Sequence, residues 1–155
     1  MIELPSNIVR IKVPLKGNPL GFVNSYLVVS EEGCILIDSG WNTEDSFMAL
    51  EKGVREAGKA LADVAYLVAT HAHPDHFGLM GRLQEHTDAR VIIHESELRS
   101  IAAIDADRQQ YVRASEDWLR RNGVPASLLA RLSEAYLEMM SRAADIKRAE
   151  PVRGA

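Results

Sequence analysis

The sequence is poor in several residue types, and each shortage excludes a class of protein. Cys34 is the only cysteine among 155 residues, so an internal disulfide and a cysteine-based zinc finger are excluded. Cys34 lies in an apolar run, where burial in a strand is expected. Lysine and arginine number 18 against 22 acidic residues, the net charge is −4, and no basic run offsets it. We therefore expect no nucleic-acid partner.

Long apolar runs are also missing. No stretch approaches the roughly 18 apolar residues that a membrane span needs. The N-terminus lacks the basic start and sustained apolar run of a signal peptide. The apolar fraction of 46% and charged fraction of 26% are typical of a soluble globular protein, and the length suits one domain. These features predict a cytoplasmic protein with no membrane partner.

The first part of the chain has the patterns of a mixed α/β protein. Apolar runs and alternation predict strands at residues 8–15, 22–29, 34–40, 63–70 and 89–94. Helices are expected at residues 43–58 and 79–86, the first of them capped by Thr43. The order is strands, helix, strand, loop, helix, strand.

From Glu95 onward the pattern changes, because no strand signal returns. Helical segments are expected at residues 95–104, 106–122 and 125–144. The last two carry apolar stripes, for example Tyr111 with Trp118. Such stripes favour ordinary core or packing surface, and a face that closes over a substrate or binds a partner chain is the alternative.

A cluster of metal-ligand residue types follows the strand predicted at residues 63–70. In "VATHAHPDHFG", three of the five histidines and an aspartate fall within six positions. The cluster consists of His71, His73, Asp75 and His76. Imidazole and carboxylate are donors that a zinc-like ion prefers when no thiolate is present. Pro74 favours a loop here, because it disfavours helix at the preceding residue. His86 and His94 are expected to be structural or exposed.

These residues carry a resemblance to a known family. "THAHPDHFG" resembles the signature of the metallo-β-lactamase superfamily, and "LIDSG" is similar to its first acidic motif, which again follows a strand. The resemblance covers roughly residues 8–95. It implies the first half of an αββα sandwich, followed by a helical insertion.

The resemblance also implies roles for individual residues. His71 and His73 would bind a first metal ion, and Asp75 and His76 a second. Asp38 would orient the ligand loop by hydrogen bonding. A metal-bound water of lowered pKa would be the nucleophile. Asp75 would be the catalytic residue that also orients or deprotonates this water.

The rest of the family's ligand set has no counterpart in this sequence. A third histidine, a bridging aspartate and a last histidine are missing, since no histidine follows His94. We therefore expect residues 1–94 to be the N-terminal half of the domain and residues 95–155 to be a helical insertion or lid. The second half would be absent, or a homodimer would complete the site.

The sequence thus predicts a zinc hydrolase with one or two ions that acts on a small ester, thioester, lactone or amide. Metal affinity of the isolated chain should be poor, because catalytic zinc ordinarily has three protein ligands. Two alternatives stay open. One is a mononuclear iron oxygenase on the same scaffold, and the other is a non-catalytic half-domain that binds another chain.

Overall fold

The protein is described by a computed structural model that covers residues 4–141, 143 and 145–153. In this part of the chain six strands form one mixed sheet in the order β1-β2-β3-β4-β5-β6. The strands are β1 (Ile8–Pro14), β2 (Phe22–Val28), β3 (Cys34–Ile37), β4 (Val64–Val68), β5 (Arg90–His94) and β6 (Ala149–Val152). The predicted α/β class is confirmed, and each strand expected before residue 95 is present.

The pairing of the strands decides where functional residues can meet. β1, β2 and β3 are antiparallel neighbours, whereas β3, β4, β5 and β6 run parallel. Val68, the last residue of β4, lies opposite Ile37 of β3 and Ile92 of β5. Because parallel strands end at the same edge of a sheet, the segments that follow β3, β4 and β5 lie side by side.

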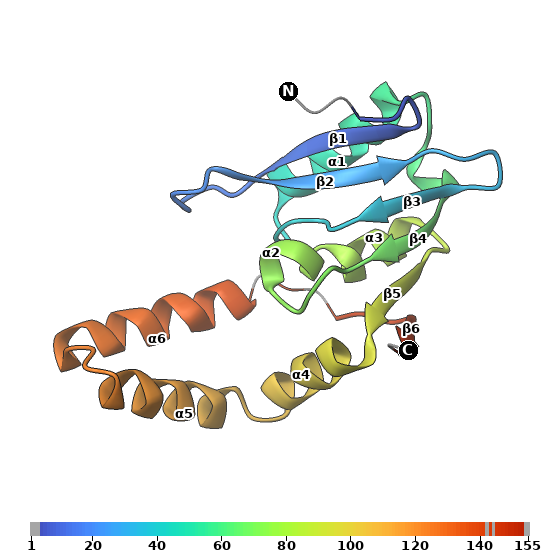
Figure 1. Cartoon of the computed structure of the whole chain (residues 1–155). Coiled ribbons are helices and arrows are strands. Elements are labelled where there is room, and N and C mark those ends of the chain that lie inside the picture. The colour runs from blue at the N-terminus through green and yellow to red at the C-terminus, as the bar shows by residue number, and fades with distance from the viewer. Residues whose placement is uncertain (1–3, 142, 144, 154–155) are drawn as a thin grey trace.

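The helices differ in what they cover. They are α1 (Glu44–Glu56), the 3-10 helix η1 (Leu61–Asp63), α2 (Pro74–Phe77), α3 (Met80–His86), α4 (Glu95–Ala106), α5 (Arg108–Arg121) and α6 (Ala126–Ser141). Figure 1 shows α1 and α3 on one face of the sheet. Thr43 caps α1 as expected, since its side chain accepts a hydrogen bond from the Ser46 amide. α1 packs so closely that a Cβ at Gly53 would lie 2.7 Å from side-chain atoms of Ile11.

The core lies between the sheet and these two helices. The strand side chains Leu36, Leu67 and Val91 are at most 1% exposed, and Leu50 of α1 is fully buried. Cys34 is buried in β3, as expected from the sequence. Alternation along each strand therefore directs one set of side chains into this layer.

The strand β6 was not predicted. Its residues, "AEPV", show no alternation and are all exposed, and the strand pairs only with β5 among the described residues. The side chain of Gln84 in α3 explains its position. Its Nε2 donates to Ala89 O and Arg148 O, and its Oε1 accepts from the amides of Lys147 and Arg148. A tertiary contact, rather than local pattern, therefore places β6.

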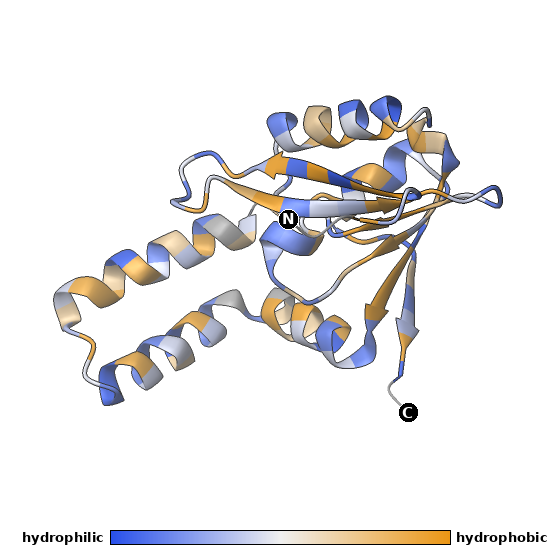
Figure 2. Ribbon diagram, turned by 45° about the horizontal axis from the view of Figure 1, so that its top comes forward, coloured by the Kyte–Doolittle hydropathy of each residue, from blue (hydrophilic) through white to orange (hydrophobic). Residues whose placement is uncertain are grey.

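The helices expected after residue 95 are present, and two of them, α5 and α6, lie outside the sheet layer (Figure 1). α5 and α6, the helical arm (residues 108–141), extend away from the sheet (Figure 1). Figure 2 shows hydrophobic segments on the arm as well as on the strands. The arm's exposed large apolar residues are Tyr111, Trp118, Leu128, Leu132 and Leu137. Leu129 and Met140 are buried, so the stripes form core only in part.

No helix in the described part of the chain combines the length and the apolar character that crossing a membrane would require.

Candidate metal centre

The four clustered residues lie at the sheet edge where β3 and β4 end. Asp38 directly follows β3, and Thr70 comes two residues after β4. The Ala69 amide donates to Ile92 O at 2.9 Å, which fixes the start of the histidine segment against β5. Strand ends therefore hold both sequence motifs at one place.

Part of the cluster is helical, which corrects the expectation of a loop. Pro74 is the first residue of α2, and His73 is its N-cap with extended backbone angles. The amides of His76 and Phe77 donate to His73 O at 2.8 and 3.2 Å. Proline suits the first position of a helix, because its missing N–H would have no partner there. Asp75 and His76 consequently lie in one helical turn.

The structure brings the four predicted side chains together. The ring centroid of His71 lies 4.7 Å from that of His73 and 4.1 Å from that of His76. His76 Nε2 is 3.6 Å from Asp75 Oδ2. His73 is exposed, and the other three are half-buried. Their convergence follows from geometry, whereas metal binding by them stays a prediction.

Asp38 is the buried anchor of the site. Its φ of 59° lies in the left-handed region, which aspartate tolerates better than most residues. Its amide donates to Val68 O, and its own carbonyl accepts from Ser25 Oγ. Its carboxylate accepts from the Thr70 amide and hydroxyl at 2.9–3.0 Å and from His76 Nδ1 at 2.7 Å. Asp38 thus joins the two strand ends.

The segment after Asp38 also holds α2. Ser39 donates to His76 O through its amide at 2.7 Å and its hydroxyl at 3.0 Å. The Leu79 amide donates to Gly40 O at 3.1 Å. Gly40 has φ of 82°, and a Cβ there would lie 2.5 Å from Val13 Cγ1. Only glycine fits this position without strain.

The contact with Asp38 determines which nitrogen of His76 is free. A carboxylate can only accept a hydrogen bond, so His76 Nδ1 must carry the proton. The Nε2 atom of the neutral ring then keeps its lone pair, and it faces Asp75. This carboxylate–histidine arrangement is the one that orients metal-binding histidines.

Thr70 extends the same logic to His71. Its single hydroxyl proton is donated to Asp38, so its oxygen can only accept from His71 Nδ1, which lies 3.1 Å away. His71 Nε2 is then the unprotonated nitrogen. Sequence reasoning gave Thr70 no role. The available signal was a hydroxyl residue between a strand end and the first histidine.

The pKa values of His71 and His76 are shifted in opposite directions. Burial, followed by the nearby His76 and His73, lowers the pKa of His71. The hydrogen bond to Asp38 raises the pKa of His76 despite partial burial. A lowered pKa keeps His71 neutral near pH 7, as a metal ligand must be.

The donors fit a metal ion in type and partly in number. Two donors 3.6 Å apart, each about 2.0–2.1 Å from a zinc-sized ion, would subtend about 120° at it. His76 Nε2 and Asp75 Oδ2 therefore have a spacing that one ion could span. Among the residues that the structure describes, no three His, Cys, Asp or Glu side chains are grouped to hold one ion. The assignment of two donors to each ion is compatible with this.

Comparisons with known proteins show which family this chain resembles. The family model of the metallo-beta-lactamase superfamily matches residues 18–136. The probable metallo-hydrolases YqjP and YqgX of Bacillus subtilis are 35% identical over 74 residues and 28% identical over 93 residues. A crystal structure of a metallo-beta-lactamase family protein from Thermus thermophilus superposes with a TM-score of 0.79 at 28% identity.

These matches cover different shares of the proteins. They span 48% of this chain and 23% of YqjP, and 60% of this chain and 41% of YqgX. The Thermus thermophilus match covers 97% of this chain and 47% of the other. The chain therefore spans less than half of these relatives. Relatives named metallo-hydrolases imply a divalent metal. Because the family model matches well over half of its residues, the chain belongs to the metallo-beta-lactamase superfamily.

Proposed function

We propose that this chain forms the first metal-ligand site of a zinc-dependent hydrolase that acts on a small ester, thioester, lactone or amide. The observation that carries the proposal is the contact between His76 Nδ1 and Asp38 at 2.7 Å. In the neutral ring this contact leaves the lone pair on His76 Nε2, which lies beside Asp75. Buried carboxylates that orient histidines in this way are typical of metal sites.

Each residue has a role in the proposal. His71 and His73 bind one ion, and Asp75 with His76 binds a second, if two are present. Bound zinc supplies Lewis-acid activation of water near neutral pH. The Asp75 carboxylate has two oxygens, so one can bind metal while the other accepts a proton from the attacking water. Asp38 and Thr70 hold both imidazoles in the tautomer that leaves Nε2 unprotonated.

The proposal includes a ligand shortage within this sequence. Among the described residues, no three potential ligands are grouped so that they could hold one ion. An open catalytic zinc site ordinarily has three protein ligands. We expect the remaining donors to come from solvent, from a second copy of the chain, or from residues outside this sequence. Zinc binding by the chain alone should therefore be weak.

Zinc titration by calorimetry tests the site. The purified chain should bind zinc with an affinity that His71→Ala abolishes and Asp38→Ala lowers about ten- to a hundredfold, as loss of an outer-shell partner does. His86→Ala is the matched control, because exposed His86 packs on Phe47 outside the cluster. Equal binding by the wild type and His71→Ala would refute the ligand assignment.

A parallel assay tests the reaction class. Generic thioester and lactone substrates should be hydrolysed slowly, and Asp75→Asn should remove this turnover. Tight zinc binding by a monomer with rapid turnover would show that the proposed ligand shortage is wrong. Metal analysis that found iron, together with oxygen consumption, would replace the hydrolase proposal with the oxygenase alternative.

A further inference from the structure

A carboxylate from α4 reaches the loop between the first two histidines. The Ala72 amide donates to Glu97 Oε2 at 2.8 Å, and the two residues are 25 positions apart in the sequence. Both are half-buried. A hydrogen bond to an ionised acceptor is shorter and stronger than one between neutral groups. This contact therefore holds the peptide between His71 and His73.

The contact lies where the loop has left the sheet and has not yet entered a helix. The Ala69 amide is bound to Ile92 O before it, and the His76 amide is bound to His73 O after it. Residues 71–73 belong to no strand or helix, apart from the capping role of His73. Glu97 consequently restrains a stretch whose ends are fixed by other elements.

The start of α4 is itself fixed, which gives Glu97 a defined position. α4 begins directly after β5, and β5 is the parallel neighbour of β4. His94 caps the helix by accepting from the Ser96 amide at 3.2 Å. Leu98 packs against the core. Strand, cap and core contact together direct the Glu97 carboxylate at the loop.

We propose that Glu97 is a positioning residue that sets the relative orientation of His71 and His73 by anchoring the Ala72 amide. The two rings meet edge to face at 4.7 Å, and a rotation of the intervening peptide would move both. The inference rests on the proposed function in that these rings are the expected ligands. It adds a link between the site and α4, whose sequence continues into the helical arm.

The neighbouring Glu95 provides a matched control. It also lies in the first turn of α4, and it pairs with Arg99 and Arg153. Glu95→Leu and Glu97→Leu remove the same charge from the same helix terminus. Glu97→Gln keeps an oxygen that can accept from Ala72, so it separates the hydrogen bond from the charge.

Two measurements on the 155-residue chain test the inference. In the metal-free protein, NMR should show loss of the downfield shift and exchange protection of the Ala72 amide in Glu97→Leu, with altered His71 and His73 ring signals. Glu95→Leu should leave these signals unchanged. Cobalt titration followed by visible absorption should give about ten- to a hundredfold weaker binding for Glu97→Leu, with most of the affinity restored in Glu97→Gln.

The possible results separate this inference from the proposed function. Unchanged ring signals and unchanged cobalt affinity in Glu97→Leu would overturn the positioning role, although the metal site would stand. Equal losses in Glu95→Leu and Glu97→Leu would also overturn it, because the cause would then be the helix terminus. If the wild type binds no cobalt, the proposed function fails, and the NMR comparison alone decides the role of Glu97.

Discussion

The sheet with α1 and α3 and the helical arm use apolar residues in different ways. In the sheet layer, Leu50 and Leu67 are at most 1% exposed and meet partners far away in sequence. In the arm, Trp118 is 64% exposed and Leu132 is 40% exposed. Burial of a large apolar side chain contributes about 1.5–3 kcal/mol, so the sheet layer should carry most of the free energy of unfolding. The candidate metal centre lies in the sheet layer, which is the region with the larger buried core.

The largest difference between the two regions is expected from truncation of a leucine in each. Leu67→Ala in β4 should lower the free energy of unfolding by about 2–5 kcal/mol, because it opens a cavity in a fully packed layer. Leu132→Ala in the arm should cost less than about 1 kcal/mol, since the side chain is 40% exposed. Urea unfolding followed by circular dichroism measures both. Similar losses would show that the arm is as tightly packed as the sheet layer.

A pair of glycines sharpens the comparison at the level of the backbone. Gly40 and Gly123 have φ of 82° and 84°, but only Gly40 has neighbouring atoms within 4 Å of the Cβ position, and the nearest of them is Val13 Cγ1. Alanine at either site costs about 1–2 kcal/mol for the left-handed backbone. Crowding at Gly40 should add about 1–3 kcal/mol.

Thermal unfolding of Gly40→Ala and Gly123→Ala checks this expectation. The melting temperature should fall further for Gly40→Ala, and its difference from Gly123→Ala isolates the crowding against Val13. Equal shifts would mean that β1 moves to make room for a methyl group.

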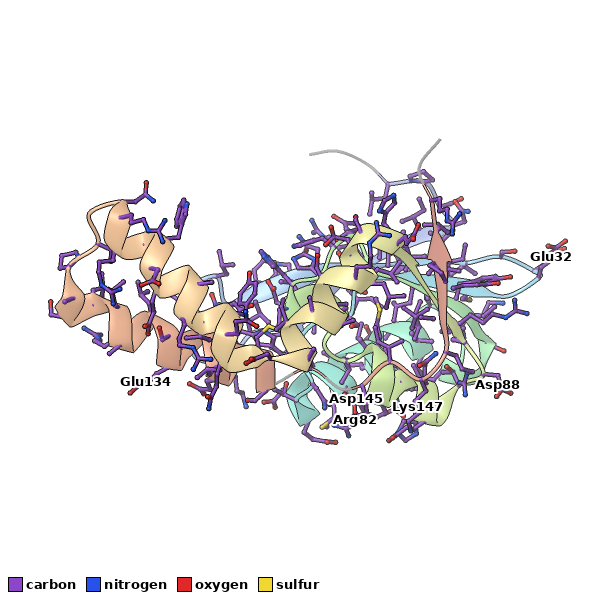
Figure 3. The ribbon with its side chains drawn as sticks, turned by 90° about the horizontal axis from the view of Figure 1, so that it is seen from below. Glu32, Arg82, Asp88, Glu134, Asp145 and Lys147 are labelled. Carbon is purple, nitrogen blue, oxygen red and sulfur yellow. The ribbon has the colours of Figure 1, made fainter. Side chains whose placement is uncertain are left out.

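The smallest expected effect on stability concerns a surface ion pair between α3 and the segment that follows the arm. Lys147, labelled in Figure 3, has its Nζ 2.8 Å from Glu85 Oε1, and this contact lowers the pKa of Glu85. A carboxyl whose pKa is lowered on folding stabilises the protein above its ordinary pKa, and this contribution is lost as pH falls through the lowered value. The pair is exposed, so its effect should be slight.

Melting temperatures of wild type and Lys147→Ala between pH 3 and about 7 test this sign. The difference in melting temperature between the two proteins should be largest near neutral pH and should disappear on acidification. Lys52→Ala is the control, because its looser pair with Glu56, at 3.6 Å, is also exposed. A gap that widened in acid would contradict the assignment.

The predictable features were those encoded by local pattern. Alternation located the strands, and the position of both motifs after strands predicted that Asp38 would meet the histidines. Pro74 was ambiguous, because it disfavours helix before itself and favours helix after itself. The second effect prevails here. The turn of α2 was therefore missed, although the residues in it were named.

Features that depend on tertiary contacts could not be predicted. β6 has no strand pattern and is placed by Gln84, more than sixty positions earlier. Glu97 looks like an ordinary acidic residue in the first turn of a helix until Ala72 is seen beside it. The stripe on α5 has helical spacing that is equally compatible with core and with surface. Only the arrangement of the arm distinguishes the two.

The parallel pairing of β5 with β6 makes the helical arm a detour between neighbours. Val91 lies opposite Ala149, and parallel strands can be joined by about a dozen residues. α4 alone has 12 residues. The arm thus adds length that strand pairing does not need, and doubling a loop costs only about 0.6 kcal/mol in closure entropy. The pairing of β5 with β6 consequently does not set the length of the arm. We expect that the arm can be replaced while the strands and the histidine segment keep their register.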